Sequence, residues 1–252
     1  MKKIISLNVN KFRGSSSSHY QNNNAGNKFI KEERFHNKII DYIDEVDDKN
    51  APLEIVILQE FPAKNKVAQE FIESMKKRKY NIVPYVKNPS ITVMFVRENI
   101  AYEVLKNPNE LAGRSKIIKV DELIIYGTHI PHDYSKESNV KENFWDEIIE
   151  NLCKKNENKD LIMIGDFNTS DESSTAYKKY EALLEEGYID CWKWKNKGNN
   201  LSIATEKRYR NRLDLCIVTE SMIKKINDLV IDQDVMDKKE ISDHSALILY
   251  LK

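Results

Sequence analysis

Short runs rich in isoleucine and valine recur along this chain, and they restrict its possible folds more than any other feature. Each run is strand length and is bounded by polar or turn residues: KIISLNV, LEIVILQ, ITVMFV, SKIIKV, LIIYGTH, LIMIG, RLDLCIV and ALILYL. Between some of them, apolar residues at spacings of three and four predict amphipathic helices over residues 28–46, 64–79, 138–153 and 173–186.

The order of these elements predicts an α/β protein with two packed mixed sheets. Strands and helices alternate in parts of the chain, but consecutive strands between residues 80 and 129 indicate hairpins within a mixed sheet. A four-layer αββα sandwich, with helices flanking the two sheets, accommodates both features. The length of 252 residues is within the range of one large domain, and we expect a single domain over residues 1–252.

The charge balance argues against a protein that coats nucleic acid without specificity. Lys plus Arg number 40 and Asp plus Glu number 40, so the formal net charge is zero. Such coating proteins are usually basic, and this chain can carry at most a local basic patch. A phosphate-bearing substrate remains compatible with this balance because a bound cation can supply positive charge.

The cysteines and the N-terminus favour a cytoplasmic protein. Cys153, Cys191 and Cys216 match no zinc-site spacing, and we expect three reduced, mostly buried thiols. The opening MKKIISLNVN has too few apolar residues for a signal peptide, whose apolar region needs about 7–15. No run approaches the roughly 18 apolar residues of a membrane span.

Polar side chains sit at the ends of strands that are otherwise apolar: Asn8, Glu60, His129, Asp166, Asn168, Asp214, Asp243 and His244. Each has an ordinary explanation when taken alone; Glu60, for example, could pair with a lysine. Together they are harder to explain, because clustered carboxylates repel one another unless a cation or proton lies among them. Asp166 and Asn168 are two apart, so an extended segment would point both toward one phosphate or one attacking water.

Six blocks in order, LNVN, LQE, GTHIP, GDFNTS, RLD and SDHSAL, resemble the endonuclease/exonuclease/phosphatase superfamily, whose members include deoxyribonuclease I. The resemblance spans essentially the whole chain. It implies the four-layer αββα sandwich and a divalent-metal-dependent phosphoesterase that uses Mg²⁺, with Mn²⁺ as an alternative. It also implies that Glu60 is the chief metal ligand, with Asn8 beside it and Asp243 near the metal.

The resemblance implies catalytic roles for five further residues. Asp166 would orient or deprotonate the attacking water, and Asn168 would hold the scissile phosphate. His244 would donate to a phosphate oxygen, while Asp214 would fix its tautomer and orientation. His129 would bind phosphate or assist the leaving oxygen. In-line attack requires an activated water, a charge sink and a stabilised leaving group, and these residues can provide all three.

The segment KRYRNR immediately precedes Asp214 and has two interpretations. It is either a solvated charged loop or a patch that follows substrate phosphates, with Lys207, Arg208 and Arg210 as phosphate ligands and Tyr209 available for base stacking. Arg114 is a further candidate for binding a neighbouring phosphate.

Three functions therefore remain open. The favoured one is a nuclease acting on DNA or RNA through a local basic patch, as a monomer. The second is a phosphodiesterase or phosphatase acting on a small phosphoester such as an inositol phosphate, a nucleotide or a lipid headgroup. The third is a non-catalytic binding module. We also expect the low-complexity segment 14–27 to form a surface loop, either unrelated to function or at the mouth of a site, and CWKWK to be an edge strand.

Overall fold

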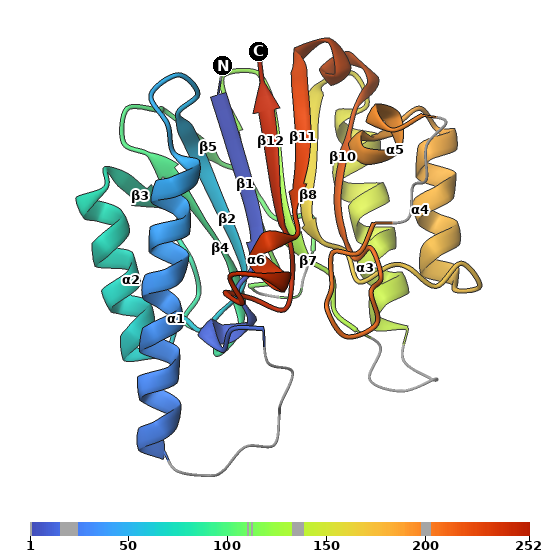
Figure 1. The fold of residues 1–252 in the computed structure, drawn as a ribbon. Helices are drawn as coiled ribbons and strands as arrows, with labels where there is room; N and C mark the ends of the chain where they lie inside the picture. Colours follow the sequence, from blue (N-terminus) through green and yellow to red (C-terminus); the bar gives the residue numbers. More distant parts are fainter. Residues whose placement is uncertain (1, 16–24, 110, 112, 133–138, 198–202) are drawn as a thin grey trace.

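The computed structural model contains two six-stranded mixed sheets packed face to face (Figure 1). It describes residues 2–15, 25–109, 111, 113–132, 139–197 and 203–252. The first sheet has the order β11 (Ile226–Asp232), β12 (Ala246–Leu251), β1 (Lys2–Asn8), β2 (Leu53–Phe61), β4 (Ile91–Arg97) and β3 (Tyr80–Ile82). The second has the order β5 (Glu103–Val104), β6 (Ser115–Val120), β7 (Leu123–His129), β8 (Asp160–Asp166), β10 (Asp214–Val218) and β9 (Ile189–Asp190).

Helices cover the outer face of each sheet. On the first sheet these are α1 (Ala25–Val46) and α2 (Lys66–Lys77), and on the second they are α3 (Val140–Ile148), continued by a π-helical turn (Ile149–Cys153), and α4 (Thr175–Glu185). Shorter helices lie in the connections: η1 (Asn10–Phe12), η3 (Lys154–Asn156), α5 (Cys191–Lys195), η4 (Glu220–Lys225) and α6 (Asp234–Asp237).

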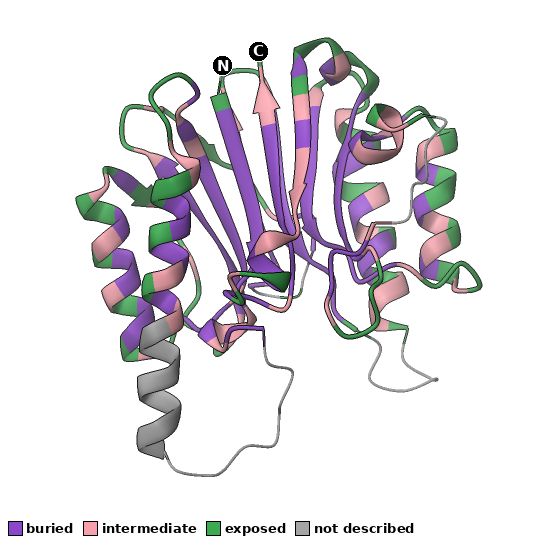
Figure 2. Ribbon diagram, in the orientation of Figure 1, coloured by how far each residue is buried: buried purple, intermediate pink, exposed green. Residues whose placement is uncertain are grey.

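Three apolar cores hold the four layers together. One lies between the first sheet and its two helices, the second between the sheets, and the third beneath α3 and α4. The central strands of both sheets are buried on both faces, whereas the edge strands β3, β5 and β11 are partly exposed; the described parts of the long helices are buried on the side that meets a sheet (Figure 2). This burial explains why the strands are continuous apolar runs while the helices are amphipathic.

The strand directions bring the polar strand ends to one edge of the sandwich. β1 and β2 are parallel, with α1 between them in sequence, and β7 and β8 are parallel, with α3 between them. Parallel strands end at the same edge of a sheet. β12 and β10 run antiparallel to β1 and β8, so they begin at that edge. The predicted site residues before and after these strands therefore converge.

The predicted αββα sandwich is confirmed, as are the eight strands and the four long helices. The sequence did not predict β3, β5, β9 and β11. The prediction of an edge strand for CWKWK is wrong, because these residues form α5. The carboxylate of Asp190 caps this helix, accepting hydrogen bonds from the backbone N–H groups of Trp192 at 2.9 Å and Lys193 at 3.1 Å.

The predictions for the thiols and for the low-complexity segment have different outcomes. All three cysteines are free and buried, as expected. Of the segment 14–27, residues 25–27 belong to α1, whereas residues 16–24 lie outside the described residues.

Candidate active site

The structure brings five of the predicted residues into one buried cluster at the converging edge: Asn8, His129, Asp166, Asp214 and His244. Asp166, at the end of β8, is the common partner. Its Oδ2 accepts a hydrogen bond from Asn8 Nδ2 at 3.0 Å and lies 3.7 Å from His129 Nε2. The same oxygen lies 3.9 Å from His244 Nε2. Donors from three other segments thus face one carboxylate oxygen.

Burial raises the pKa of Asp166, although the charge of His244 opposes this rise. Asp166 is therefore a stronger base than an exposed aspartate.

Gly165 allows Asp166 to reach this position. Its φ is +150°, and a Cβ at this residue would lie 2.1 Å from the backbone oxygen of Thr128 on β7. Only glycine permits such a close approach of the two strands. The glycine in LIMIGD is therefore the local reason that β8 delivers its terminal carboxylate beside His129, which pairs with Asp166 in register.

His244 and Asp214 form the strongest polar pair in the cluster. His244 Nδ1 lies 2.8 Å from Asp214 Oδ2, and both side chains are buried. Burial alone would lower the pKa of His244, but the Asp214 carboxylate raises it well above its usual value. This shift favours the protonated imidazole, whose Nε2 lies 3.9 Å from Asp166 Oδ2.

His129 differs from His244 in charge state. Burial lowers the pKa of His129 to about 4, although the Asp166 carboxylate opposes this effect. Arg114 contributes to the lowering, and its Nη1 lies 3.1 Å from His129 Nδ1. Arg114 therefore lies against a histidine of the cluster, and its role as a neighbouring phosphate ligand stays a prediction. The pKa values of the two histidines are therefore shifted in opposite directions, which favours a neutral His129 and a charged His244.

Asn168 follows the strand in a turn with a left-handed backbone, at φ 49°. Its backbone N–H donates to Asp166 Oδ1 at 3.0 Å, and its side-chain Nδ2 donates to the backbone oxygen of Ile130 at 2.7 Å. Its buried Oδ1 has no hydrogen-bond partner among the described residues. A buried amide oxygen without a partner is costly, which indicates that a donor or cation belongs beside it.

Glu60 and Asp243 lie at the mouth of the cluster and are only partly buried. Burial acts to raise the pKa of Glu60, but electrostatic interactions with the His129 imidazole and with the Lys11 ammonium outweigh it and lower the pKa. Burial raises the pKa of Asp243, and the negative charge of Glu60 adds to this rise although His244 opposes it. Two neighbouring carboxylates that can be approached from solvent form a site that favours a cation.

Two sets of residues could hold a metal ion. One carboxylate or imidazole atom from each of Asp166, Asp214 and His244 lies within 4.8 Å of the others. In this set the facing atoms of His244 and Asp214 are already joined by a hydrogen bond. The second set is Glu60 with Asp243, where Lys11 Nζ already stands 3.4 Å from Glu60 Oε2 as a monovalent cation. Oxygen donors, mutual repulsion and access to solvent make the second set the better fit for a hydrated divalent ion.

Asn8 fits this second set in a limited way. Its Nδ2 donates to Asp166 and its Oδ1 accepts from the backbone N–H of Asn10 at 3.0 Å. The amide oxygen keeps one lone pair for a cation. The contacts present in the structure hold Asn8 as a support for Asp166.

The basic segment is anchored beside the cluster. The backbone N–H of Lys207 donates to the backbone oxygen of Asp243 at 2.9 Å. Lys207 Nζ lies 3.5 Å from a carboxylate oxygen of Glu240, and Arg210 Nη1 lies 2.9 Å from one of Asp237. Part of the predicted positive patch is therefore neutralised within the chain.

Arg208 and Tyr209 form the outer part of the segment. The guanidinium of Arg208 stacks over the Tyr209 ring with 4.8 Å between them, and it makes no ion pair within the described parts of the chain. Tyr209 is 65% exposed, which leaves its ring available for stacking. Arg212, by contrast, points away and pairs with buried Asp190 at 2.8 Å.

Sequence reasoning missed three residues that position or approach the cluster. Thr205 Oγ1 accepts the backbone N–H of Asp214 at 2.9 Å, and Ser242 Oγ donates to the backbone oxygen of Asn8. Ser242 Oγ also accepts the backbone N–H of His244 at 3.2 Å. Lys11 reaches Glu60 from the turn after β1. Only Ser242, in SDH, lies within a motif that the sequence marked.

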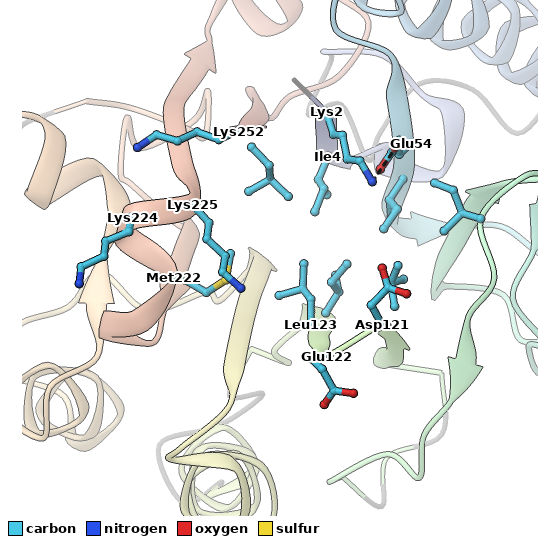
Figure 3. A pocket seen from close by; sticks show the side chains of 15 residues that line it. Lys2, Ile4, Glu54, Asp121, Glu122, Leu123, Met222, Lys224, Lys225 and Lys252 are labelled. Carbon is cyan, nitrogen blue, oxygen red and sulfur yellow. Dashed lines mark ion pairs between the residues drawn. The ribbon is translucent and has the colours of Figure 1, made fainter.

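A cavity of about 410 Å³ opens between the sheets at the opposite end of the sandwich (Figure 3). Its rim includes Lys2, which begins β1 and pairs with Glu54 at 3.4 Å, whereas Asn8 ends β1 at the candidate site. No predicted site residue lines this cavity. We therefore do not place the chemistry there.

Within the described residues, no helix has the length and apolar character needed to cross a membrane.

Comparison with known proteins gives a consistent fold. No family model and no curated protein matches the sequence. Among solved structures, the chain is similar to an AP endonuclease from Archaeoglobus fulgidus, with a TM-score of 0.72, 18% identity and complete coverage of both chains. It is also similar to the 3'-5' exonuclease NExo from Neisseria meningitidis, with a TM-score of 0.72, 16% identity and 99% coverage of both chains.

A humanized TDP2 of D. rerio is similar over the same extent, with a TM-score of 0.62, 16% identity and coverage of 99% of this chain and 98% of that one. At these identities the likeness establishes the fold. The chain therefore shares its fold with these solved structures, which agrees with the four-layer sandwich that its strand-end motifs predicted.

Proposed function

We propose that this chain is a divalent-metal-dependent phosphodiesterase, and specifically a nuclease that hydrolyses DNA or RNA. The observation that carries the proposal is the convergence on Asp166 Oδ2 of Asn8, His129 and His244, from the ends of separate strands. A base held among phosphate-binding donors is the arrangement that in-line hydrolysis needs. Two of the similar structures, an AP endonuclease and an exonuclease, support the same reaction class.

Each side chain has one role in this proposal. Asp166 takes a proton from the attacking water as the new bond to phosphorus forms and the bond to the leaving oxygen breaks. Protonated His244, held by Asp214, donates to a phosphate oxygen and stabilises its developing charge. Neutral His129 donates a hydrogen bond to the leaving oxygen. Asn168 binds the scissile phosphate through the Nδ2 hydrogen that the Ile130 oxygen does not take.

The metal site in this proposal comprises Glu60 and Asp243, with Asn8 beside them. A divalent cation bound there supplies Lewis acidity and neutralises phosphate charge. We propose Mg²⁺ as the natural ion and Mn²⁺ as a substitute, since all three residues offer oxygen donors. We further propose that residues 1–252 act as one catalytic domain, as a monomer in the cytoplasm.

The second candidate is a phosphodiesterase or phosphatase for a small phosphoester. The observation that favours it is the internal pairing of Lys207 with Glu240 and of Arg210 with Asp237, which lowers the charge available for a polynucleotide. The nuclease interpretation then depends mainly on Arg208, Tyr209 and Arg114 for contacts beyond the scissile phosphate.

A substrate panel with Mg²⁺, Mn²⁺ or EDTA tests the proposal. It should include plasmid DNA, single-stranded DNA, RNA, an AP-site duplex, bis-p-nitrophenyl phosphate and inositol phosphates. We expect metal-dependent cleavage of a polynucleotide with an affinity that falls steeply with salt, by about 0.7–0.9 log units per log unit of salt for each phosphate neutralised. Faster turnover of an inositol phosphate, with a shallow salt dependence, would favour the second candidate.

Variants of the basic segment sharpen this test. Arg208→Ala should raise KM on the polynucleotide and flatten the salt slope by up to about one phosphate equivalent. Adding Lys207→Ala and Arg210→Ala should flatten the salt slope further, but by less than two phosphate equivalents. Glu240 and Asp237 already neutralise these two basic side chains. Both the Arg208→Ala variant and the triple variant should leave kcat/KM on bis-p-nitrophenyl phosphate nearly unchanged, since that ester reaches only the buried cluster. An unchanged salt slope in the triple variant would contradict the nuclease interpretation.

A further inference from the structure

The turn that follows β1 has an unusual backbone. Three consecutive residues, Asn10, Lys11 and Phe12, have φ values of 43°, 52° and 61°. Side chains with a Cβ are unfavourable in this left-handed region, and a run of three such residues persists only where its surroundings impose it. Glu60, across the mouth of the site, is also left-handed at φ 52°.

Contacts on both sides of Lys11 hold this turn in place. Phe12 is fully buried, and its ring lies 5.4 Å from the rings of both Phe61 and Phe71. Asn10 Nδ2 donates to the backbone oxygen of Gly14 at 2.9 Å. The backbone of Lys11 is therefore fixed, and only its flexible side chain can change position.

The Lys11 ammonium rests on the carboxylate to which we assign the metal. Its Nζ lies 3.4 Å from Glu60 Oε2, with side-chain exposures of 31% for Lys11 and 24% for Glu60. The pair sits at the solvent side of the cluster, whereas Asp166, His129 and His244 are buried beneath it. A partly exposed ion pair contributes little to stability, so the contact between Lys11 and Glu60 can be exchanged at low cost.

The ammonium and a divalent ion compete for the same carboxylate. At a given distance the doubly charged ion interacts more strongly, so it displaces Lys11 from Glu60. The released side chain remains at the mouth of the site because its backbone is clamped. A phosphodiester substrate can then replace the Glu60 carboxylate as the negatively charged partner of the Lys11 ammonium.

We propose that Lys11 is a substrate-phosphate ligand that Glu60 holds until a divalent cation takes its carboxylate. This inference rests on the proposed phosphodiesterase function and on the metal role of Glu60. It makes metal uptake and substrate binding interdependent: the cation at Glu60 frees the ammonium for a phosphate oxygen, and by linkage the bound phosphate favours retention of the cation.

Mn²⁺ binding measured by titration calorimetry, without substrate, provides the first test. Lys11→Met removes the competing charge at similar side-chain length, and we expect Mn²⁺ to bind roughly twofold to fivefold more tightly. Lys11→Arg keeps the charge and should resemble the wild type. Thermal melts in EDTA confirm that each variant is folded. Unchanged or weaker Mn²⁺ binding by folded Lys11→Met protein would overturn the proposal and leave the nuclease function untouched.

Binding of a phosphorothioate oligonucleotide, with and without Mn²⁺, provides the second test. In the wild type we expect Mn²⁺ to strengthen oligonucleotide binding more than it does in Lys11→Met, and Lys11→Arg should retain most of this coupling. Equal coupling in the wild type and Lys11→Met would overturn the phosphate role of Lys11. A wild-type protein that binds Mn²⁺ but no oligonucleotide would refute the nuclease function and this role together.

Discussion

The pairing of Asp214 with His244 makes a quantitative prediction about catalysis. His244→Ala removes the charged donor that faces Asp166, and the loss of one transition-state donor costs roughly 2–4 kcal/mol, or a rate decrease of about 30-fold to 1,000-fold. In the wild type, His244 Nδ1 lies 2.8 Å from Asp214 Oδ2. Asp214→Asn keeps an oxygen acceptor at this place, so it should raise the activation free energy by only ~1.5 kcal/mol.

If Asp214 acts only through His244, the two losses overlap. The loss in kcat/KM of the double variant should then be about that of His244→Ala alone. Once the imidazole has been removed, Asp214 has nothing left to orient. The appropriate assay is kcat/KM on bis-p-nitrophenyl phosphate at saturating Mg²⁺. A double variant whose loss equals the sum of the two single losses would refute the reasoning.

The same variants separate the two candidate metal sites. Asp214 and His244 belong to the group whose atoms lie within 4.8 Å of one another with Asp166, and a cation held there would depend on both. We expect the Mg²⁺ concentration for half-maximal rate to stay unchanged in Asp214→Asn. A large increase in this Mg²⁺ concentration would indicate that the metal binds at the buried group rather than at Glu60.

Three further predictions concern the framework of the site. Gly165→Ala should destabilise the fold by about 3 kcal/mol or more in urea denaturation, since its Cβ would lie 2.1 Å from the Thr128 oxygen; a cost below about 1 kcal/mol would contradict the close approach. The pKa of His129 is about 4 in the folded protein and about 6.5 in the unfolded chain, so protonation of His129 favours unfolding. Between pH 6.5 and 4 the free energy of unfolding of the metal-free protein should therefore fall by up to about 3 kcal/mol from this residue. The free energy of unfolding of His129→Gln should fall less over the same pH range. Arg212→Met leaves the buried Asp190 carboxylate without its 2.8 Å partner and should cost about 3–5 kcal/mol of stability, with the salt slope of polynucleotide binding unchanged at a temperature where the variant is folded.

The sequence predicted the strands and the convergence of their polar ends because both follow from local pattern. Apolar runs buried on two faces mark β1, β2, β7 and β8 directly. β11 escaped prediction because INDLVID has only three consecutive apolar residues, 229–231, between polar ones at a sheet edge, where its burial is mixed. The transfer of the chain from β4 in the first sheet to β5 in the second has no local signature, since it depends on how the two sheets pack.

The candidate site was predictable only where its residues lie next to strands. Asp166 and His129 pair in register, so their neighbourhood follows from topology. Lys11 gave no signal, because its proximity to Glu60 arises from a left-handed turn that the sequence does not announce. The neutralisation of Lys207 and Arg210 likewise depends on Glu240 and Asp237, which come from a distant segment.

The most direct test of the central claim is the Mg²⁺ dependence of phosphodiester hydrolysis in the wild type and in Glu60→Gln. The substitution keeps the size of the side chain but removes the carboxylate charge on which a hydrated cation depends. We predict that EDTA abolishes wild-type turnover, and that folded Glu60→Gln protein either needs much more Mg²⁺ for half-maximal rate or shows no turnover. Turnover in EDTA, or the same Mg²⁺ requirement in both proteins, would contradict a metal-dependent phosphodiesterase centred on Glu60.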